Sequence, residues 1–573
     1  MFNFNQYKNV TKISIGNKVT ISNNDFSNKF YNLRNLISCT IPYEKINNIC
    51  YMYERCYNLT DSPVCSNNVI SMSYTYSNCS NLIGSPVCGP NVIDMSWTYR
   101  DCHNLTGSPI CGDNVTNMYR TYEGCRNLTG NPICGDNVTS MFSTYYCCYN
   151  LTGSPICGNN VINMGQTYSN CYNLIGSPVF GPNVTSMSWT YWGCNNLTGS
   201  PVCCYNVIYI SNTYNHCSNL IGSPVCGNNV ISMVSTYSNC SNLIGSPVCG
   251  NNVTNMWCTY GDCSNLTGSP ICGEKVTSMF DTYSGCYNLT GSPICGDNVT
   301  DMYCTYSYCY NLTGSPICGN KVTNMQSTYF CCYNLTGSPI CGNNVTYMGQ
   351  TYRDCRNLTG SPVCGNNVTS MYYTYSGCTK LTGNPICGNN VTTMRSTYTD
   401  CRNLTGSPVC GPNVINMYET YWRCNNITGN PVCGINVINM SSAYCNCYNL
   451  TGNPVCGNNV TDMSYTYTNC YNITGSPVCG PNVTNMYSAY KDCSKLSDGD
   501  TYWYSNNISN VTNCFYGKNN ANIYNIHVPT NSITFNTMII NNSSSLVGTS
   551  ITWTNNGTCW YNTVYNIYIY PDL

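Results

Sequence analysis

A cysteine recurs every 23 residues along most of this chain, and this period limits what the chain can fold into. The series runs from Cys56 to Cys493, so 20 cysteines keep the spacing without an insertion or deletion. Chains with a fixed period of roughly 20 to 50 residues form arrays in which each repeat buries its core against its neighbours. The sequence therefore predicts a solenoid of about 20 coils over residues 33–496.

Both ends of the chain depart from this repeat. Residues 1–32 precede the first copy, and we expect them to form an N-terminal cap. The period stops after Leu496, and residues 497–573 are predicted to form a small C-terminal β-rich domain. Alternating or aromatic-rich character predicts three short strands in it, at residues 522–528 (NIYNIHV), 532–540 (SITFNTMII) and 565–570 (YNIYIY).

Several columns of the repeat hardly change from copy to copy, and such positions are expected to face a shared core. Met72, Tyr76 and Cys79 represent three of them, at positions i, i+4 and i+7, which is typical of one face of a short helix. The residue before each Met is Ser, Asp, Asn or Thr in nearly every copy, as in Ser71, which predicts a helix N-cap. Asn81 and its equivalents would then end the helix in the left-handed conformation.

The remaining segment, NLTGSPVC, must return the chain to the next helix in an extended form. Leu82 and Val87 are its expected inward residues, and stacked copies would form a parallel ladder. The proline in each copy removes a ladder hydrogen bond, so strands of roughly two to four residues are expected. The predicted class is an α/β repeat solenoid, leucine-rich-repeat-like, with a short strand and a short helix in each 23-residue coil.

The repeat resembles a known family. Residues 114–128, NVTNMYRTYEGCRNL, are similar to the BspA-like leucine-rich repeats, whose units carry V-T-x-[IM]-x-x-[AM]-F-x-x-C-x-x-L. The resemblance covers residues 33–496. The chain departs from the family pattern by having Tyr for Phe, and L-T-G-S-P-V-C for the family's strand L-x-x-[LIV]-x-[LI]. Members are adhesins and other surface-exposed binding proteins, and similar arrays occur in phage tail proteins, so the resemblance implies a surface-binding solenoid.

Four columns vary freely, namely the two residues after each Met and the two after each Tyr. On the expected helix they lie opposite the Met, Tyr and Cys face and point to solvent. All five tryptophans of the array fall in these columns, and Trp, Tyr and Arg are enriched in binding hot spots. Relaxed constraint on a tolerant outer face remains the alternative. The predicted binding residues are Tyr74, Trp97, Arg100, Tyr119, Arg120, Trp189, Trp192, Trp257, Arg353, Tyr373, Arg395, Tyr418, Trp422 and Arg423.

The charge of the chain narrows the class of partner. Charged residues make up 8% of the sequence and the net charge is −1. The sequence therefore predicts no positively charged surface that would bind nucleic acid or an anionic membrane. The sequence has no apolar stretch of about 18 residues, so no membrane insertion is predicted. The expected partner is a glycan or protein on a host or bacterial surface, and homo-oligomerisation or assembly into a virion stays open.

The chain contains 48 cysteines, and a second cysteine column runs from Cys65 to Cys479 with Phe180 in one place. Phenylalanine in a cysteine position indicates a buried apolar column, so reduced core thiols are favoured over the disulfides that ladder spacing would also permit. Zinc sites use close cysteine pairs or histidines, whereas here the regular spacing is nine residues and the chain has three histidines. No metal and no cofactor are expected.

Catalysis needs a unique constellation of side chains, whereas a repeat offers the same residues in every coil, so no enzyme is expected. The first 16 residues, MFNFNQYKNVTKISIG, show neither a continuous apolar region nor a cleavage motif, so we expect no secretory signal peptide. The sequence favours a non-enzymatic recognition or adhesion protein at an extracellular or virion surface, for example a phage tail appendage. The alternative is a passive spacer or fibre that carries the C-terminal domain.

Overall fold

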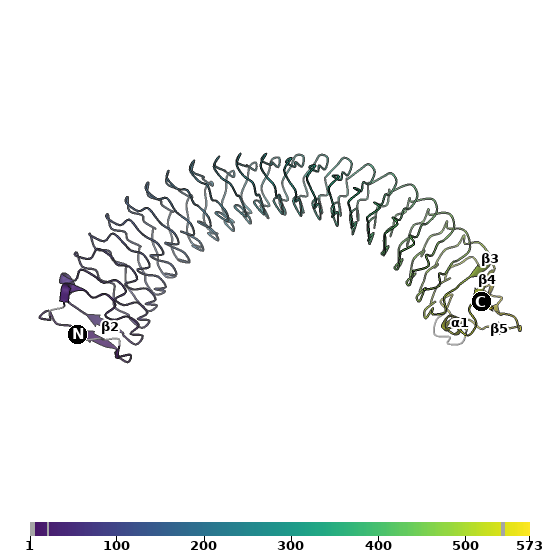
Figure 1. Cartoon of the computed structure of the whole chain (residues 1–573), viewed down its shortest axis with the longest axis horizontal. Helices are drawn as coiled ribbons and strands as arrows, with labels where there is room; N and C mark the ends of the chain where they lie inside the picture. Colours follow the sequence, from purple (N-terminus) through teal and green to yellow (C-terminus); the bar gives the residue numbers. More distant parts are fainter. Residues whose placement is uncertain (1–5, 20–21, 540–544) are drawn as a thin grey trace. The chain divides into compact units, whose positions relative to one another are not determined.

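The computed structural model describes residues 6–19, 22–539 and 545–573. Its contacts divide the chain into two units, Met1–Leu289 and Thr290–Leu573, and each unit is a stack of coils (Figure 1). Within both units, parallel bridges join residues 23 positions apart in neighbouring coils, as between Ser71 and Asp94. The predicted repeat solenoid is thereby confirmed in each unit, but these parallel bridges lie at the residue before each Met and not in the segment NLTGSPVC, where the sequence predicts the ladder.

The interior of the coils is the one that the sequence predicts. Five columns are almost completely buried in every described coil, and they are represented by Val69, Met72, Tyr76, Cys79 and Leu82. The tyrosine rings stack from coil to coil; those of Tyr99 and Tyr122 have centroids 5.5 Å apart and are 5° from parallel. Identical side chains therefore pack on one another along each unit, and each coil completes the core of the next.

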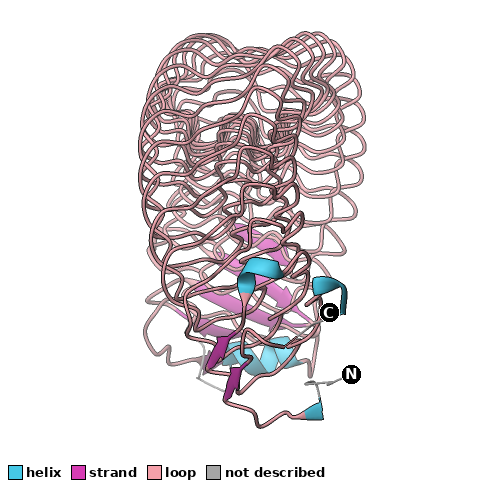
Figure 2. Cartoon of the chain, turned by 90° about the vertical axis from the view of Figure 1, so that its left-hand side faces the viewer, coloured by secondary structure: helices cyan, strands magenta, loops and turns pink. Residues whose placement is uncertain are grey.

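The helix expected around Met, Tyr and Cys is absent from the described coils, so this prediction is wrong (Figure 2). Every second N–H from Met72 to Asn78 donates to a carbonyl of the next coil, as Tyr74 does to Ser96 at 3.0 Å. N–H groups between them close four-residue turns, as from Thr75 to Met72. Left-handed φ values of 57° at Tyr74 and 61° at Asn78 interrupt any helix. The spacing i, i+4, i+7 arises here from turns that alternate with bonds to the next coil.

Two further helix signals have other roles. The residue before each Met forms the bridge of the ladder, and its side chain accepts a hydrogen bond from the N–H two positions later, as Asn117 Oδ1 does from Tyr119 at 3.0 Å. Such local turns favour Ser, Asp, Asn and Thr as strongly as a helix N-cap does. The Asn81 column does not adopt the left-handed conformation. Its amides form a ladder instead, in which Asn81 Nδ2 donates to Asn58 Oδ1 at 3.4 Å.

The segment NLTGSPVC forms no strand in the described coils, which corrects the expectation of one strand per coil. Leu82 is buried as predicted, but Pro86 is the second buried residue and Val87 is half-buried. The Tyr99 hydroxyl donates to the Val87 carbonyl at 2.7 Å and accepts from the Val87 N–H at 2.9 Å. This pair of bonds satisfies the peptide group that follows the proline. It gives a physical reason for Tyr at the position where the BspA-like pattern has Phe.

Short regular elements occur near both ends of the chain. Near the N-terminus they are β1 (Lys12–Ser14), η2 (Ser22–Asn24), β2 (Ser38–Thr40) and η3 (Tyr43–Lys45). Near the C-terminus they are β3 (Gly499–Tyr502), β4 (Tyr524–Val528), α1 (Ile533–Ile539), β5 (Thr554–Asn555), β6 (Trp560–Asn562) and β7 (Ile567–Pro571). β1 and β2 pair in parallel. The five C-terminal strands form one mixed sheet in the order β3-β4-β7-β6-β5.

Two of the three C-terminal strand predictions are confirmed, by β4 and β7, and the third is wrong because SITFNTMII contains α1. Ser532 Oγ accepts a hydrogen bond from the Phe535 N–H at 3.1 Å, as a helix N-cap does. Thr534, Thr537 and Met538 are buried with helical spacing. The coil ladder also continues past the expected boundary at residue 497, since Asn485 forms a parallel bridge with Asn510.

Candidate binding surface

Many large side chains of the four variable columns lie at the surface, but small members of the same columns, such as Ser77 and Ser143, are buried, which corrects the expectation that all four columns point to solvent. We call the columns of residues 73, 74, 77 and 78 the variable stripe. All 14 predicted binding residues are exposed or half-exposed, with Trp189 at 38% and Trp257 at 48% among the most open. The backbone still limits this variation, because the columns of Tyr74 and Asn78 are left-handed. The Asn78 column is accordingly Asn, Asp or Gly in most copies.

In the first unit, the stripe gathers arginines around Trp97. The Trp97 ring stacks on Tyr74 with centroids 5.2 Å apart, and the guanidinium groups of Arg100 and Arg120 lie 4.8 and 4.7 Å from its centroid. Both arginines also pair with Glu123, at 3.4 and 3.2 Å. Burial raises the pKa of Glu123 above its ordinary value, although Arg120 and Arg100 oppose the shift. The cluster presents flat faces whose charges are mostly paired internally.

Further along the first unit, Trp189 and Trp192 meet edge to face at 5.6 Å, and Trp192 lies 6.3 Å from the His216 ring. Trp257 meets Phe280 edge to face at 5.6 Å. These contacts hold the indole rings against neighbouring coils while leaving part of each ring open. The tryptophans are therefore fixed in place before any partner arrives, which lowers the entropy cost of binding.

In the second unit, arginines lie over aromatic rings of the stripe. Arg353 is 4.8 Å from the Tyr373 ring, and Arg395 is 5.2 Å from the Tyr418 ring. Arg423 is 4.1 Å from the Trp422 ring. The structure therefore brings the predicted residues of this unit together in three pairs. Their role in binding stays a prediction.

A fifth variable column was missed by the sequence reasoning. It directly follows the buried cysteine that recurs every 23 residues, which we call the framework cysteine. It holds large residues in many coils, such as Arg126 and Tyr149, and the Arg126 guanidinium lies 5.7 Å from the centroid of the Tyr149 ring. Arg356 and Tyr333 form a similar pair at 4.6 Å. We call it the post-cysteine column. Its variation in the sequence was a sufficient signal, but the expected helix directed attention to four columns only.

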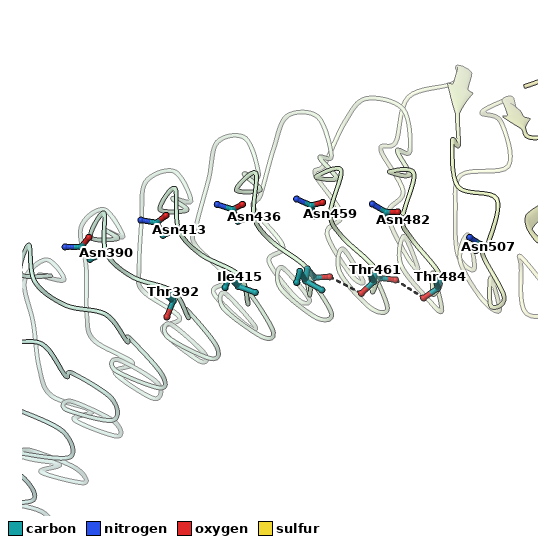
Figure 3. Close-up of a pocket in the computed structure, with 11 residues that line it drawn as sticks. Asn390, Thr392, Asn413, Ile415, Asn436, Asn459, Thr461, Asn482, Thr484 and Asn507 are labelled. Atoms are coloured by element: carbon teal, nitrogen blue, oxygen red, sulfur yellow. Dashed lines mark hydrogen bonds between the residues drawn. The ribbon is translucent and has the colours of Figure 1, made fainter.

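A groove lined by asparagine, threonine and isoleucine follows another face of the coils (Figure 3). In the second unit it has a volume of about 760 Å³ and runs from Asn390 to Asn507. From Asn390 to Asn482 the asparagine of each coil donates to the preceding coil, as Asn413 Nδ2 does to the Asn389 carbonyl at 2.9 Å. A groove of about 590 Å³ uses the same columns in the first unit. These asparagines are framework residues, so the groove repeats its chemistry where the variable stripe changes it.

The framework thiols serve the core. Cys102 Sγ donates to the Tyr76 carbonyl of the preceding coil at 3.0 Å, and burial raises the pKa of the Cys102 thiol well above its ordinary value. The second column is mostly half-buried, which corrects the expectation of a buried column. Burial nevertheless raises the pKa of the Cys88 thiol to about 12. Thiols of both columns are therefore weak nucleophiles near neutral pH.

The described residues contain no group of three or more His, Cys, Asp or Glu side chains placed to hold a metal ion. Within the same residues, no helix is both long and apolar enough to cross a membrane.

A family model described as "Mycoplasma protein of unknown function, DUF285" matches residues 414–528. No curated protein matches the chain. Among solved structures, the chain is similar to "Crystal structure of TLR13-ssRNA13 complex", with 10% sequence identity, a TM-score of 0.15, and coverage of 84% of this chain and 87% of that chain. A TM-score this low supports no inference about this chain. The chain is thus similar to the DUF285 family over its last coils, β3 and β4.

Proposed function

We propose that this protein is a non-enzymatic recognition or adhesion protein, in which the coils present the variable stripe to a glycan or protein on a host or bacterial surface. The observation that carries the proposal is the placement of Trp, Tyr and Arg on the stripe. These residue types are enriched in binding hot spots. Here they are held by ring stacking and cation–π contacts and are left partly open to solvent.

The charge of the stripe supports the same class of partner. The arginines near Trp97 are paired with Glu123 and Asp101, and the whole chain has a net charge of −1. A polyanion would find little unpaired positive charge to bind. Neutral hydrogen-bonding groups and aromatic faces instead match glycans and polar protein surfaces.

The resemblance of the repeat to BspA-like adhesins supports a location at a cell or virion surface. A phage tail or other virion appendage is one setting for such a protein, because similar arrays occur in phage tail proteins. The competing proposal is a passive spacer or fibre, which the ladder of each unit would serve equally well. Only the stripe distinguishes the two, since a spacer has no use for its aromatic residues.

The test measures binding of the full chain to a panel of bacterial and host cells and to a glycan array. The first variant changes the five stripe tryptophans to serine: Trp97, Trp189, Trp192, Trp257 and Trp422. The control changes four exposed tyrosines outside the stripe to serine: Tyr205, Tyr209, Tyr347 and Tyr504. We expect the stripe variant to lose binding and the control to keep it. No binding by the unmodified protein, or equal loss in both variants, would favour the spacer.

A further inference from the structure

A pocket of about 470 Å³ interrupts the surface of the first unit. It lies where the post-cysteine column loses its large side chains: Tyr172 precedes it and Tyr287 lies at its far end, exposed by 40% and 41%. Between them the post-cysteine column holds only small residues, Asn195, Ser218, Ser241 and Ser264. These four small side chains leave a hollow in the surface. No other described stretch of the post-cysteine column has four small residues in succession.

The wall of the hollow comes from the Asn78 column, which here reads His216, Asn239 and Asp262 in successive coils. His216 Nδ1 lies 2.6 Å from Asn215 Oδ1. Because an amide oxygen only accepts, Nδ1 carries the proton, and Nε2 of the neutral ring is left as an acceptor. Asn239 Nδ2 donates to Ser238 Oγ at 3.0 Å, which fixes the amide and leaves Oδ1 to accept.

The serines of the hollow are acceptors too. Ser241 and Ser264 donate their hydroxyl hydrogens to carbonyls of the preceding coil, at 3.4 and 3.3 Å, so their oxygens offer only lone pairs to a ligand. Burial raises the pKa of Asp262 above its ordinary value, and the neighbouring Asp281 adds to the shift. Lysine and arginine are absent from the pocket lining. The hollow therefore offers acceptors and needs a ligand that brings donors.

Aromatic rings flank these acceptors. Trp192 sits beside His216, with ring centroids 6.3 Å apart, and Tyr287 lines the opposite end. Successive coils of a parallel ladder are spaced by about 4.8 Å, so His216 and Asp262, two coils apart, are separated by roughly 10 Å. That span suits a single six-membered sugar ring and its hydroxyl groups. Pockets of this kind combine apolar walls with a few convergent polar groups.

We infer that this pocket binds one neutral hexose ring, free or at the end of a glycan, whose hydroxyls donate to His216 Nε2, Asn239 Oδ1 and the Asp262 carboxylate. The inference rests on the proposed function and names the ligand class of one part of that surface. The Tyr287 ring, at the far end of the pocket, would offer an aromatic face to the sugar or to the next residue of a glycan. A charged sugar is disfavoured by the absence of a cationic partner in the lining.

The experiment titrates the full-length protein with glucose, galactose, mannose and N-acetylglucosamine, and probes a glycan array that carries each as a terminal residue. Ser241→Tyr fills the hollow with a residue that the same column accepts at Tyr172 and Tyr287, so folding is retained. Ser80→Tyr makes the same change in the same column outside the pocket. We expect Ser241→Tyr to weaken sugar binding by about tenfold or more, and Ser80→Tyr to leave it unchanged.

The outcomes separate this inference from the proposed function. Binding of a sugar in solution identifies a free ligand, and binding only on the array identifies a glycan terminus. If none of the four sugars binds in either form, or if Ser241→Tyr binds as well as the unmodified protein, the pocket assignment is overturned. Cell attachment that still depends on Trp97 and Trp422 would then leave the proposed function standing. Sugar binding without any cell attachment would overturn the proposed function alone.

Discussion

The buried columns and the variable stripe belong to the same coils but obey different constraints. In the interior, apolar side chains pack on their counterparts in the neighbouring coils, and the columns of Thr98 and Cys102 also bond to the preceding coil. Thr98 Oγ1 donates to the Met72 carbonyl of the preceding coil at 3.0 Å, and Cys102 Sγ donates to Tyr76. On the stripe, the backbone is left-handed at the Tyr74 and Asn78 columns and favours Asn, Asp and Gly at the second of them, while the residue types of the other columns vary widely. Repetition is therefore required only where a side chain must satisfy a neighbour.

The largest effect on stability is expected at alkaline pH, which ionises tyrosine and cysteine side chains of the interior. Burial raises the pKa of the Tyr99 hydroxyl and the Cys102 thiol well above their ordinary values, and the other coils repeat this. A raised folded-state pKa favours the protonated form, so the stabilisation is complete below the unfolded-state values and is lost as pH rises through them, from about 8.5 for Cys and 10 for Tyr. We expect the urea midpoint to fall steeply between roughly pH 8.5 and 10.5.

That measurement needs a comparison with neutral pH in the presence of a reductant, so that thiol oxidation does not contribute. Each unit of pKa difference contributes about 1.4 kcal/mol per group, and the array repeats both groups in each coil. A midpoint that stays constant up to pH 10.5 would show that the interior groups ionise without unfolding the coils.

The next largest loss of stability is expected when one pair of interior hydrogen bonds is removed. Tyr145→Phe deletes a hydroxyl that donates to the Ile133 carbonyl at 2.8 Å and accepts from its N–H at 3.1 Å. We expect a loss of about 2 to 4 kcal/mol in the free energy of unfolding, because two part-buried peptide groups lose their partner. Tyr209→Phe is the matched control, since Tyr209 is 55% exposed. Equal urea midpoints for the two variants would contradict the role given to the tyrosine hydroxyl.

A smaller loss of stability is expected from a substitution at Asn78, a stripe position whose backbone is left-handed. Asn78 has a φ of 61°, so Asn78→Val places a β-branched residue in the left-handed region at a cost of about 1 to 2 kcal/mol. Asn78→Gly keeps the conformation accessible and should change stability by less. Thermal unfolding of the two variants measures the difference. A valine variant as stable as the glycine variant would mean that the column is not limited by its backbone.

The smallest effect is expected on the stripe itself. Trp257→Ser changes a ring that is 48% exposed, and we expect the free energy of unfolding to shift by no more than about 0.5 kcal/mol. Chemical denaturation of this variant and of Tyr145→Phe under the same conditions provides the comparison. A loss as large as that of Tyr145→Phe would make Trp257 part of the framework and weaken its assignment to binding.

The interior could be predicted because its period is visible in the sequence: Met72, Tyr76 and Cys79 are buried as expected. The absence of the helix could not be predicted, because the same spacing also fits a backbone with two left-handed residues, four positions apart, in each coil. The abundance of Asn, Asp and Gly in the Asn78 column was the signal for that backbone. The pocket beside His216 was hidden for another reason. It is formed by missing bulk at Ser218 and Ser241, and small residues attract no attention in a sequence.

The bonds between coils repeat from one coil to the next: N–H groups such as that of Tyr74 donate to the following coil, and others such as that of Ile93 donate to the preceding coil. A gain or loss of 23 codons would therefore join two surfaces that already fit, provided the ends of the array keep their closing strands. The number of coils is free to drift between lineages while each contact stays the same. Inheritance of such a gene can lengthen the reach of the protein, or add a new stripe segment, in a single step.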